Sequence, residues 1–189
     1  NTLLHILCSI NFNERNLSDI NNCYKVLLNY YPEALKIKDS NGNIPIFLCN
    51  KNNYLNELMI ITNMDITNEY RNNLGDNYLH NIIRNGTIDV LNKPTSYGIF
   101  NNHNLVNETN NDNETPLILA CKLKKQDFCN ILINIGADMN CNDNMGNTIY
   151  HYICLYGLSD IIITNIPEIK NKLGHTPTDY IVKNLITFS

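Results

Sequence analysis

Tryptophan is absent from this chain of 189 residues, and charged residues make up only 17% of it, against about 25% in typical soluble domains. The formal net charge is −4, and lysine and arginine do not cluster as they do on a nucleic-acid-binding surface. No apolar run reaches the roughly 18 residues that a membrane-spanning helix requires. We therefore expect neither a nucleic-acid partner nor a membrane span.

The sequence also lacks the short motifs of common enzymes. It contains no glycine-rich phosphate loop, no Gly-x-Ser-x-Gly and no His-Glu-x-x-His, and its carboxylates are not spaced as an acid–base pair. Seven cysteines are an odd number without a disulfide-like spacing, which favours a reducing compartment. We expect a non-catalytic protein without a cofactor, located in the cytoplasm or also in the nucleus.

Asparagine and isoleucine are abundant instead. Both are encoded by A/T-rich codons, so their abundance fits a bias of the genome. Apolar residues make up 43% of the chain, which is enough to bury a core. The chain does not begin with methionine, and we expect it to be a piece of a longer protein.

One short pattern returns along the whole chain. It reads "NTLLHILC" at Asn1, "GNIPIFLC" at Gly42, "GDNYLHNI" at Gly75, "NETPLILAC" at Asn113, "GNTIYHYIC" at Gly146 and "GHTPTDYI" at Gly174. The equivalent threonine positions are Thr2, Ile44, Asn77, Thr115, Thr148 and Thr176. The differences between these successive numbers are 42, 33, 38, 33 and 28 residues, and internal periods of this size indicate a repeat architecture.

The repeated segments resemble ankyrin repeats, whose period is 33 residues. Glycine at the turn before the threonine position suits a backbone with positive φ, and Thr-Pro at Thr115 and Thr176 suits the start of a helix. The resemblance implies an all-α solenoid of about six helix-turn-helix repeats in one domain. The expected repeats lie near 1–38, 39–71, 72–109, 110–142, 143–170 and 171–189.

Apolar residues spaced by three and four predict the second helix of several repeats. These helices are expected near 22–31, 54–62, 127–136 and 158–166, the last one shortened. Asn53, Gly86 and Gly157 are expected to end the first helices in the left-handed conformation.

His151 and Cys154 lie three residues apart, so a helix would place both on one face, as in half of a zinc site. The same two positions recur separately, however: His80 has no cysteine partner, and Cys121 has no histidine partner. Independent variation favours packing over metal binding. The resemblance implies that the histidines hydrogen-bond a neighbouring turn and that the cysteines pack as small apolar residues. The predicted structural positions are His5, His80, His151, Thr115, Thr148, Thr176, Cys8, Cys121 and Cys154.

The other cysteines fall outside this pattern. Cys23 and Cys129 lie on the apolar faces of predicted second helices, so we expect both in the core. Cys141 follows a loop, which makes it the best candidate for an exposed, reactive thiol.

In ankyrin repeats the turn tips and the first helices form a surface that holds other proteins. Leu74, Met145 and Leu173 occupy one equivalent tip position, where they either contact a partner or lean on the adjacent tip. Tyr97 and Phe100 lie in a long insertion near 92–112, which is either filler or a contact element. The predicted contact residues are Asn41, Asn43, Leu74, Asp76, Asp112, Glu114, Asn144, Met145, Leu173, His175, Tyr97 and Phe100.

The expected function is therefore a non-catalytic scaffold for a protein partner. The Asn/Ile-rich composition and irregular spacing resemble ankyrin chains of poxviruses and other large DNA viruses. That resemblance implies a host-directed binder, either an inhibitor-of-NF-kappa-B-like decoy or a ubiquitin-ligase adaptor. The alternative is a regulatory array of a larger cellular protein from an A/T-rich genome, with catalytic or channel segments elsewhere.

Overall fold

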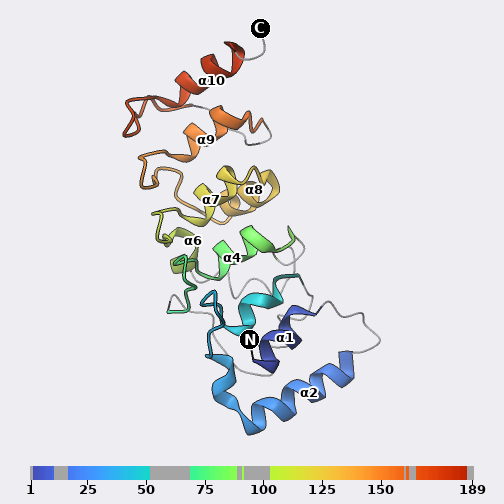
Figure 1. The fold of residues 1–189 in the computed structure, drawn as a ribbon. Helices are drawn as coiled ribbons and strands as arrows, with labels where there is room; N and C mark the ends of the chain where they lie inside the picture. The colour runs from blue at the N-terminus through green and yellow to red at the C-terminus, as the bar shows by residue number, and fades with distance from the viewer. Residues whose placement is uncertain are drawn as a thin grey trace. The chain divides into compact units, whose positions relative to one another are not determined.

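The computed structural model describes residues 2–10, 17–51, 69–88, 91, 103–159, 161 and 165–186. These residues form helices and turns without a strand, apart from an isolated bridge between Asn142 and Thr148 (Figure 1). None of the described helices is long and apolar enough to cross a membrane. The chain divides into two compact units, Asn1–Leu105 and Val106–Ser189.

The first unit is built on the packing of short helices. Helix α1 (Leu3–Ser9) packs on the 3₁₀ helix η3 (Pro45–Lys51), which also contacts α4 (Tyr78–Asn85). Helix α2 (Leu17–Tyr30) leads into η2 (Pro32–Leu35). The core of this unit is apolar and includes Leu4, Cys8, Tyr24, Ile46, Phe47, Leu79 and Ile82.

The second unit is likewise built on the packing of short helices. Helices α7 (Pro116–Lys122) and α8 (Gln126–Asn134) pack on each other as a hairpin, α9 (Ile149–Tyr156) packs on α7, and α10 (Pro177–Ile186) packs on α9. The short helix α6 (His103–Asn107) spans the boundary between the units. The core of the second unit includes Leu117, Ile118, Ala120, Cys121, Cys129, Leu132 and Ile149.

The threonine position starts the first helix of a repeat because its side chain satisfies an otherwise unpaired N–H group. Thr115 Oγ1 accepts from the Ile118 N–H at 3.3 Å, and Asn77 Oδ1 does the same for the His80 N–H at 3.1 Å. Ile44 has no oxygen to offer at the equivalent position. The segment after it forms the 3₁₀ helix η3 and not the α-helix found in the other repeats.

Of the expected ends of the first helices, one is confirmed and one is wrong. Gly157 adopts the expected left-handed conformation, with φ 62°. Gly86 does not: its φ is −90°, although its N–H still closes the helix on Ile82. At the equivalent position in the second unit, Lys124 takes the left-handed conformation, with φ 59°. Asn53 lies outside the described residues.

Two of the four predicted second helices correspond to α2 and α8. Residues 54–62 lie outside the described residues. The prediction near 158–166 is wrong where the structure describes it, because residues 158, 159, 161, 165 and 166 are not helical. Pro167 follows this segment, and a proline disfavours helical geometry in the residue before it.

The glycines at the turn tips allow a direct test of whether neighbouring tips pack closely against each other. Gly42 and Gly174 have nearly the same φ, 77° and 79°. A Cβ atom at Gly42 would lie 2.7 Å from the backbone nitrogen of Asn73, whereas one at Gly174 would have nothing within 4 Å. We expect Gly174→Ala to lower the free energy of unfolding by about 1–2 kcal/mol, the cost of positive φ alone. Gly42→Ala should cost about 2–4 kcal/mol, because overpacking adds to that strain.

Urea denaturation followed by far-UV circular dichroism measures both losses. Equal losses for the two variants would show that the contact between the tips at Gly42 and Asn73 does not constrain the fold.

Candidate functional site

Five turn tips share one hydrogen-bonded geometry. The first residue of each tip, here called the anchor, accepts two backbone N–H groups on its side-chain Oδ1, from the residues two and four positions later. All ten of these distances lie between 2.8 and 3.0 Å. The anchors are Asp39, Asn72, Asn110, Asp143 and Asn171. Because Asp and Asn have the reach to bond their own backbone two residues on, they favour such turns.

The backbone of each tip closes the same turn. The anchor N–H donates to the carbonyl of the residue four positions later, and the residue three positions later donates back to the anchor carbonyl. In all five tips, the residue three positions after the anchor has positive φ, which glycine adopts at no steric cost. Asn113 is the exception in residue type and takes φ 58°, a conformation that asparagine tolerates.

Successive tips are joined by further hydrogen bonds within each unit. In the first unit, Asn73 donates its backbone N–H to Asn41 O at 2.9 Å and its side-chain amide to Ser40 O at 3.0 Å. In the second, Asn144 donates in the same two ways to Asp112 O and Asn111 O. The tips are therefore cross-linked through their backbones, which fixes their positions within a unit.

Asparagine anchors add a contact that aspartate cannot make. The amide of Asn72 donates to Asn43 Oδ1 at 3.2 Å, and the amide of Asn171 donates to Asn147 Oδ1 at 2.7 Å. In both pairs the acceptor belongs to the preceding tip. The abundance of asparagine thus has a structural role at the tips.

The repeated histidines join a helix start to the next tip. The backbone N–H of Thr2 donates to His5 Nδ1 at 3.1 Å, so Nδ1 is an acceptor and Nε2 carries the proton. His5 Nε2 then donates to Asn43 O at 2.9 Å. His151 repeats this arrangement with Thr148 N–H and His175 O, at 3.1 Å each.

His80 differs because its partner is an asparagine. Its Nδ1 lies 2.7 Å from Asn77 Oδ1, and the Asn77 amide donates to Leu105 O at 2.9 Å. The ring is fully buried. All three histidines thus bond the residue at their own threonine position.

Three of the predicted contact residues are buried, so the prediction that they face a partner is wrong. Asn43, Asp76 and Glu114 are 8%, 0% and 1% exposed. Asp76 forms an ion pair with Arg84 at 2.7 Å, and Glu114 forms one with Lys122. Each carboxylate bonds the end of the helix that it precedes, and a buried carboxylate requires such a partner.

Six predicted contact residues are exposed. Leu74, Met145 and Leu173 leave 53%, 48% and 62% of their surface accessible, and all three stand two positions after an anchor. This place in the tip is called the contact position below. His175 is half-buried, and Tyr97 and Phe100 lie outside the described residues. The exposed residues of the prediction are Asn41, Leu74, Asp112, Asn144, Met145 and Leu173.

The cysteines are all free thiols. Cys8, Cys121, Cys129 and Cys154 are buried, and Cys121 Sγ lies 3.5 Å from Cys129 Sγ. The expectation of burial is wrong for Cys23, which is exposed. Helix α2 buries the side that carries Ile20 and Tyr24. Cys23 comes one residue before Tyr24 and lies outside that buried side.

Cys141 is not the most exposed thiol. It is half-buried, and burial together with its hydrogen bond to Asp138 raises its pKa to about 11. Because the thiolate is the reactive form, this thiol is a poor nucleophile near neutral pH. The described residues contain no group of three or more His, Cys, Asp or Glu that could hold a metal ion.

A family model described as ankyrin repeats (3 copies) matches residues 79–164. No curated protein matches the chain. The fold class is thus the all-α ankyrin-repeat class that the sequence predicts, and ankyrin repeats are a protein–protein interaction scaffold. Outside the matched residues, the tips at Asp39 and Asn171 keep the same hydrogen bonds.

The role of the anchors was missed in the sequence, although their signal was there. An Asp or Asn stands three residues before every positive-φ residue of the tips, in "DSNG", "NNLG", "NNDN", "DNMG" and "NKLG". The glycine of these segments explains the turn, but only the anchor explains why it is rigid.

His151 provides a pH-dependent test of the histidine link. Burial lowers its pKa from the ordinary value of 6.5, so protonation favours the unfolded state. The contribution of the ring to stability is complete above about pH 6.5 and is lost as the pH falls from there toward the lowered pKa. We expect His151→Gln to cost about 1–3 kcal/mol at about pH 8 and less at about pH 5. Urea denaturation at both pH values measures the difference.

Tyr180→Phe is the matched control, since the Tyr180 ring lies 6.1 Å from His151 and the substitution leaves the imidazole in place. Its cost should be the same at both pH values. A cost of His151→Gln that stays constant with pH would contradict the neutral, hydrogen-bonded ring.

Proposed function

We propose that the chain is a non-catalytic scaffold that binds a protein partner through the contact positions of its turn tips. The observation that carries this proposal is that, within each tip, one residue fixes the backbone and another exposes its side chain. The anchor fixes the backbone, while the side chain two residues later is exposed and takes no part in the turn.

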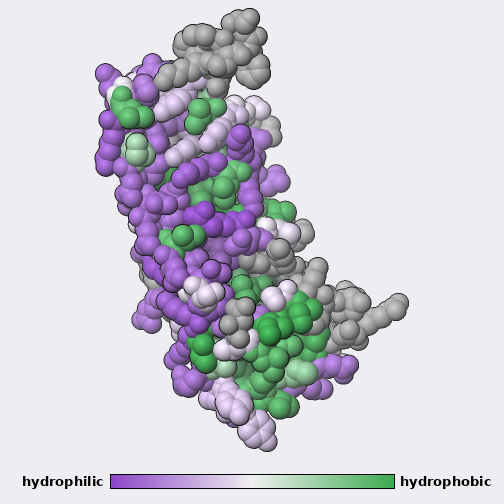
Figure 2. All heavy atoms as spheres, in the orientation of Figure 1, coloured by the Kyte–Doolittle hydropathy of each residue, from purple (hydrophilic) through white to green (hydrophobic). Residues whose placement is uncertain are grey.

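A rigid tip of this kind suits binding because little backbone freedom is lost when a partner docks. Leu74, Met145 and Leu173 offer apolar contacts, whereas Asn41 and Asp112 offer polar ones at the same position. In Figure 2, separate apolar groups lie within a largely hydrophilic part of the surface.

We further propose that the scaffold is viral and directed at a host protein, as an inhibitor-of-NF-kappa-B-like decoy or a ubiquitin-ligase adaptor in the cytoplasm or nucleus. The support for this setting is the Asn/Ile-rich composition and the irregular repeat spacing. The same two features fit the alternative, a regulatory array of a larger cellular protein. A full-length reading frame that carries an F-box-like tail favours the adaptor, whereas a kinase or channel segment favours the alternative.

Replacing the three apolar contact residues tests the tip proposal. We expect the variant Leu74→Ser, Met145→Ser, Leu173→Ser to lose its partner in affinity purification from host or infected cells. Surface substitutions usually change the free energy of unfolding by less than about 0.5 kcal/mol each, so the fold should persist. Circular dichroism checks the fold, and mass spectrometry of the bound proteins measures the loss.

A second triple variant, Leu123→Ser, Ile169→Ser, Ile181→Ser, is the control, because these residues are 40%, 42% and 40% exposed and lie outside the tips. It should keep the partner. A partner set that is the same for both variants would refute the role of the contact positions.

A further inference from the structure

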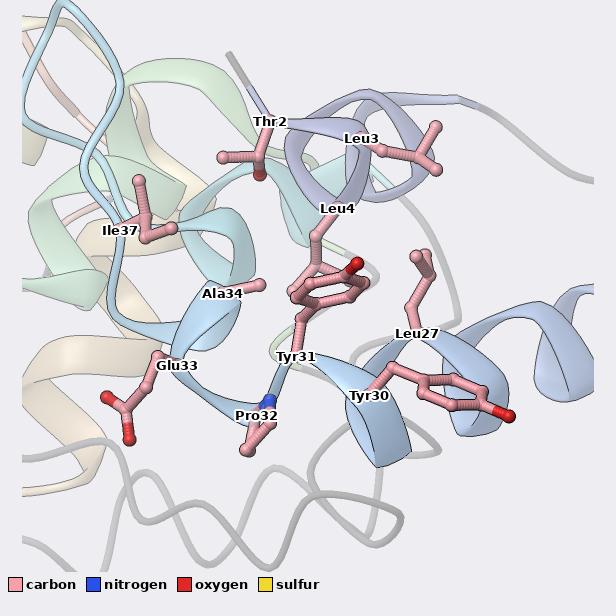
Figure 3. A pocket seen from close by; sticks show the side chains of 10 residues that line it. All are labelled: Thr2, Leu3, Leu4, Leu27, Tyr30, Tyr31, Pro32, Glu33, Ala34 and Ile37. Carbon is pink, nitrogen blue, oxygen red and sulfur yellow. The ribbon is translucent and has the colours of Figure 1, made fainter.

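The structure brings thiols together in the core of each unit. In the second unit, Cys121 Sγ lies 3.5 Å from Cys129 Sγ, and both side chains are 0% exposed. In the first unit, the Cys49 thiol is hydrogen-bonded to the Cys8 thiol. The surface hollow drawn in Figure 3, by contrast, has no cysteine or histidine among its ten lining residues. Chemistry between paired thiols therefore belongs to the core.

The contact between Cys121 and Cys129 is closer than apolar packing requires. The third repeat fills the slot of Cys121 with Ile83, which is equally buried, so the slot itself does not demand a thiol. Two thiols are too few to hold a metal ion, and no group of three or more candidate ligands exists in the described part of the chain. They can form a disulfide, whose bond length is about 2.05 Å. Sulfur atoms 3.5 Å apart must approach by about 1.5 Å to bond, which rotation of two side chains can supply.

The closed α7–α8 hairpin keeps this pair unreactive. The hydrogen bond to Cys129 and burial both raise the pKa of the Cys121 thiol well above its ordinary value. Because the thiolate is the reactive form, the closed pair is as poor a nucleophile as Cys141. Any reaction of the pair therefore requires the hairpin to open.

The turn between α7 and α8 is the weak point of the hairpin. Lys124 holds φ at 59°, a left-handed conformation that is unfavourable for a residue other than glycine. Lys125 precedes α8 without a side-chain hydrogen bond, so α8 lacks the cap that usually satisfies its first N–H groups. A strained segment with few stabilising bonds opens locally at a lower cost than the whole fold. Cys121 and Cys129 lie on either side of this turn, so its opening exposes both thiols.

We propose that Cys121 and Cys129 form a redox switch, which hydrogen peroxide oxidises to a disulfide when the α7–α8 turn opens. One cysteine sulfur attacks a peroxide oxygen, the O–O bond breaks, and the departing hydroxide takes up the thiol proton as water. The other sulfur attacks the resulting sulfenic acid, so that the S–S bond forms as the S–O bond breaks. The second thiol proton leaves with that oxygen as water. Two thiols are thus oxidised to one disulfide while one peroxide is reduced to two waters.

This disulfide would hold the hairpin closed. It links residues eight positions apart in the chain, and such a link removes conformational freedom from the opened segment. Helix α7 begins directly after the tip anchored by Asn110 and packs on α9, which begins directly after the tip anchored by Asp143. Oxidation would therefore make the helices that carry two tips harder to unfold.

Treatment of the reduced, unaltered chain with hydrogen peroxide tests the switch. Mass spectrometry of a non-reduced digest should find Cys121 joined to Cys129, and dithiothreitol should release the link. In urea denaturation, the equilibrium constant of unfolding should be about thirtyfold lower for the oxidised chain than for the reduced chain, the low end of the effect of a disulfide. Oxidation of the exposed Cys23 in the same digest verifies that the peroxide has acted.

Two variants separate this pair from the other thiols. Cys23→Ser removes an exposed thiol that could link two chains, and it should gain the same stability on oxidation. Cys129→Ala removes one sulfur of the pair and should gain none. On the unaltered chain, the absence of a link between Cys121 and Cys129 while Cys23 is oxidised would overturn the proposal, as would a linked chain that unfolds as readily as the reduced one. A folded Cys129→Ala chain that peroxide stabilises to the same extent also contradicts it.

Discussion

The structure depends on one interaction, the acceptance of two backbone N–H groups by a single anchor oxygen at each tip. At Asp143, Oδ1 bonds the N–H groups of Met145 and Asn147 at 2.9 and 2.8 Å. These donors point into a turn that has no helix or sheet partner for them, and an unpaired donor that is removed from water is costly. The anchor satisfies both donors, and its carboxylate also accepts a hydrogen bond from the Tyr152 hydroxyl. The tip, the start of the next helix and the core are thereby joined through one side chain.

The sequence predicts the parts of this fold that depend on local chemistry. Repeat spacing and the helix starts at Thr115 and Thr148 follow from a few neighbouring residues. The burial of Asp76 and Glu114 could not be predicted in this way. Each pairs with a cation eight residues later, at the far end of a helix, and whether that cation folds back over the carboxylate depends on the packing of the whole repeat.

Cys23 and η3 were misjudged for a related reason. An apolar stripe predicts which face of a helix is buried but not where that face ends. Cys23 and Tyr24 are adjacent in the chain, yet Cys23 is exposed and Tyr24 is buried. In the second repeat, Ile44-Pro45 preserves the proline of the helix start but not the capping oxygen, and the shorter-range hydrogen bonds of a 3₁₀ helix result. Asparagine was likewise explained by composition alone, although Asn72 and Asn171 bond the preceding tips.

The geometry at the contact position has an evolutionary consequence. The backbone N–H of Leu74, Met145 and Leu173 is held by an anchor whatever side chain the residue carries. Substitutions there are nearly neutral for folding, so selection on recognition can act on them without a compensating change elsewhere. An anchor has no such freedom, since only Asp or Asn supplies an acceptor at the right distance. Under the proposed function, lineages of such a chain would exchange partners rapidly while the underlying architecture stays the same.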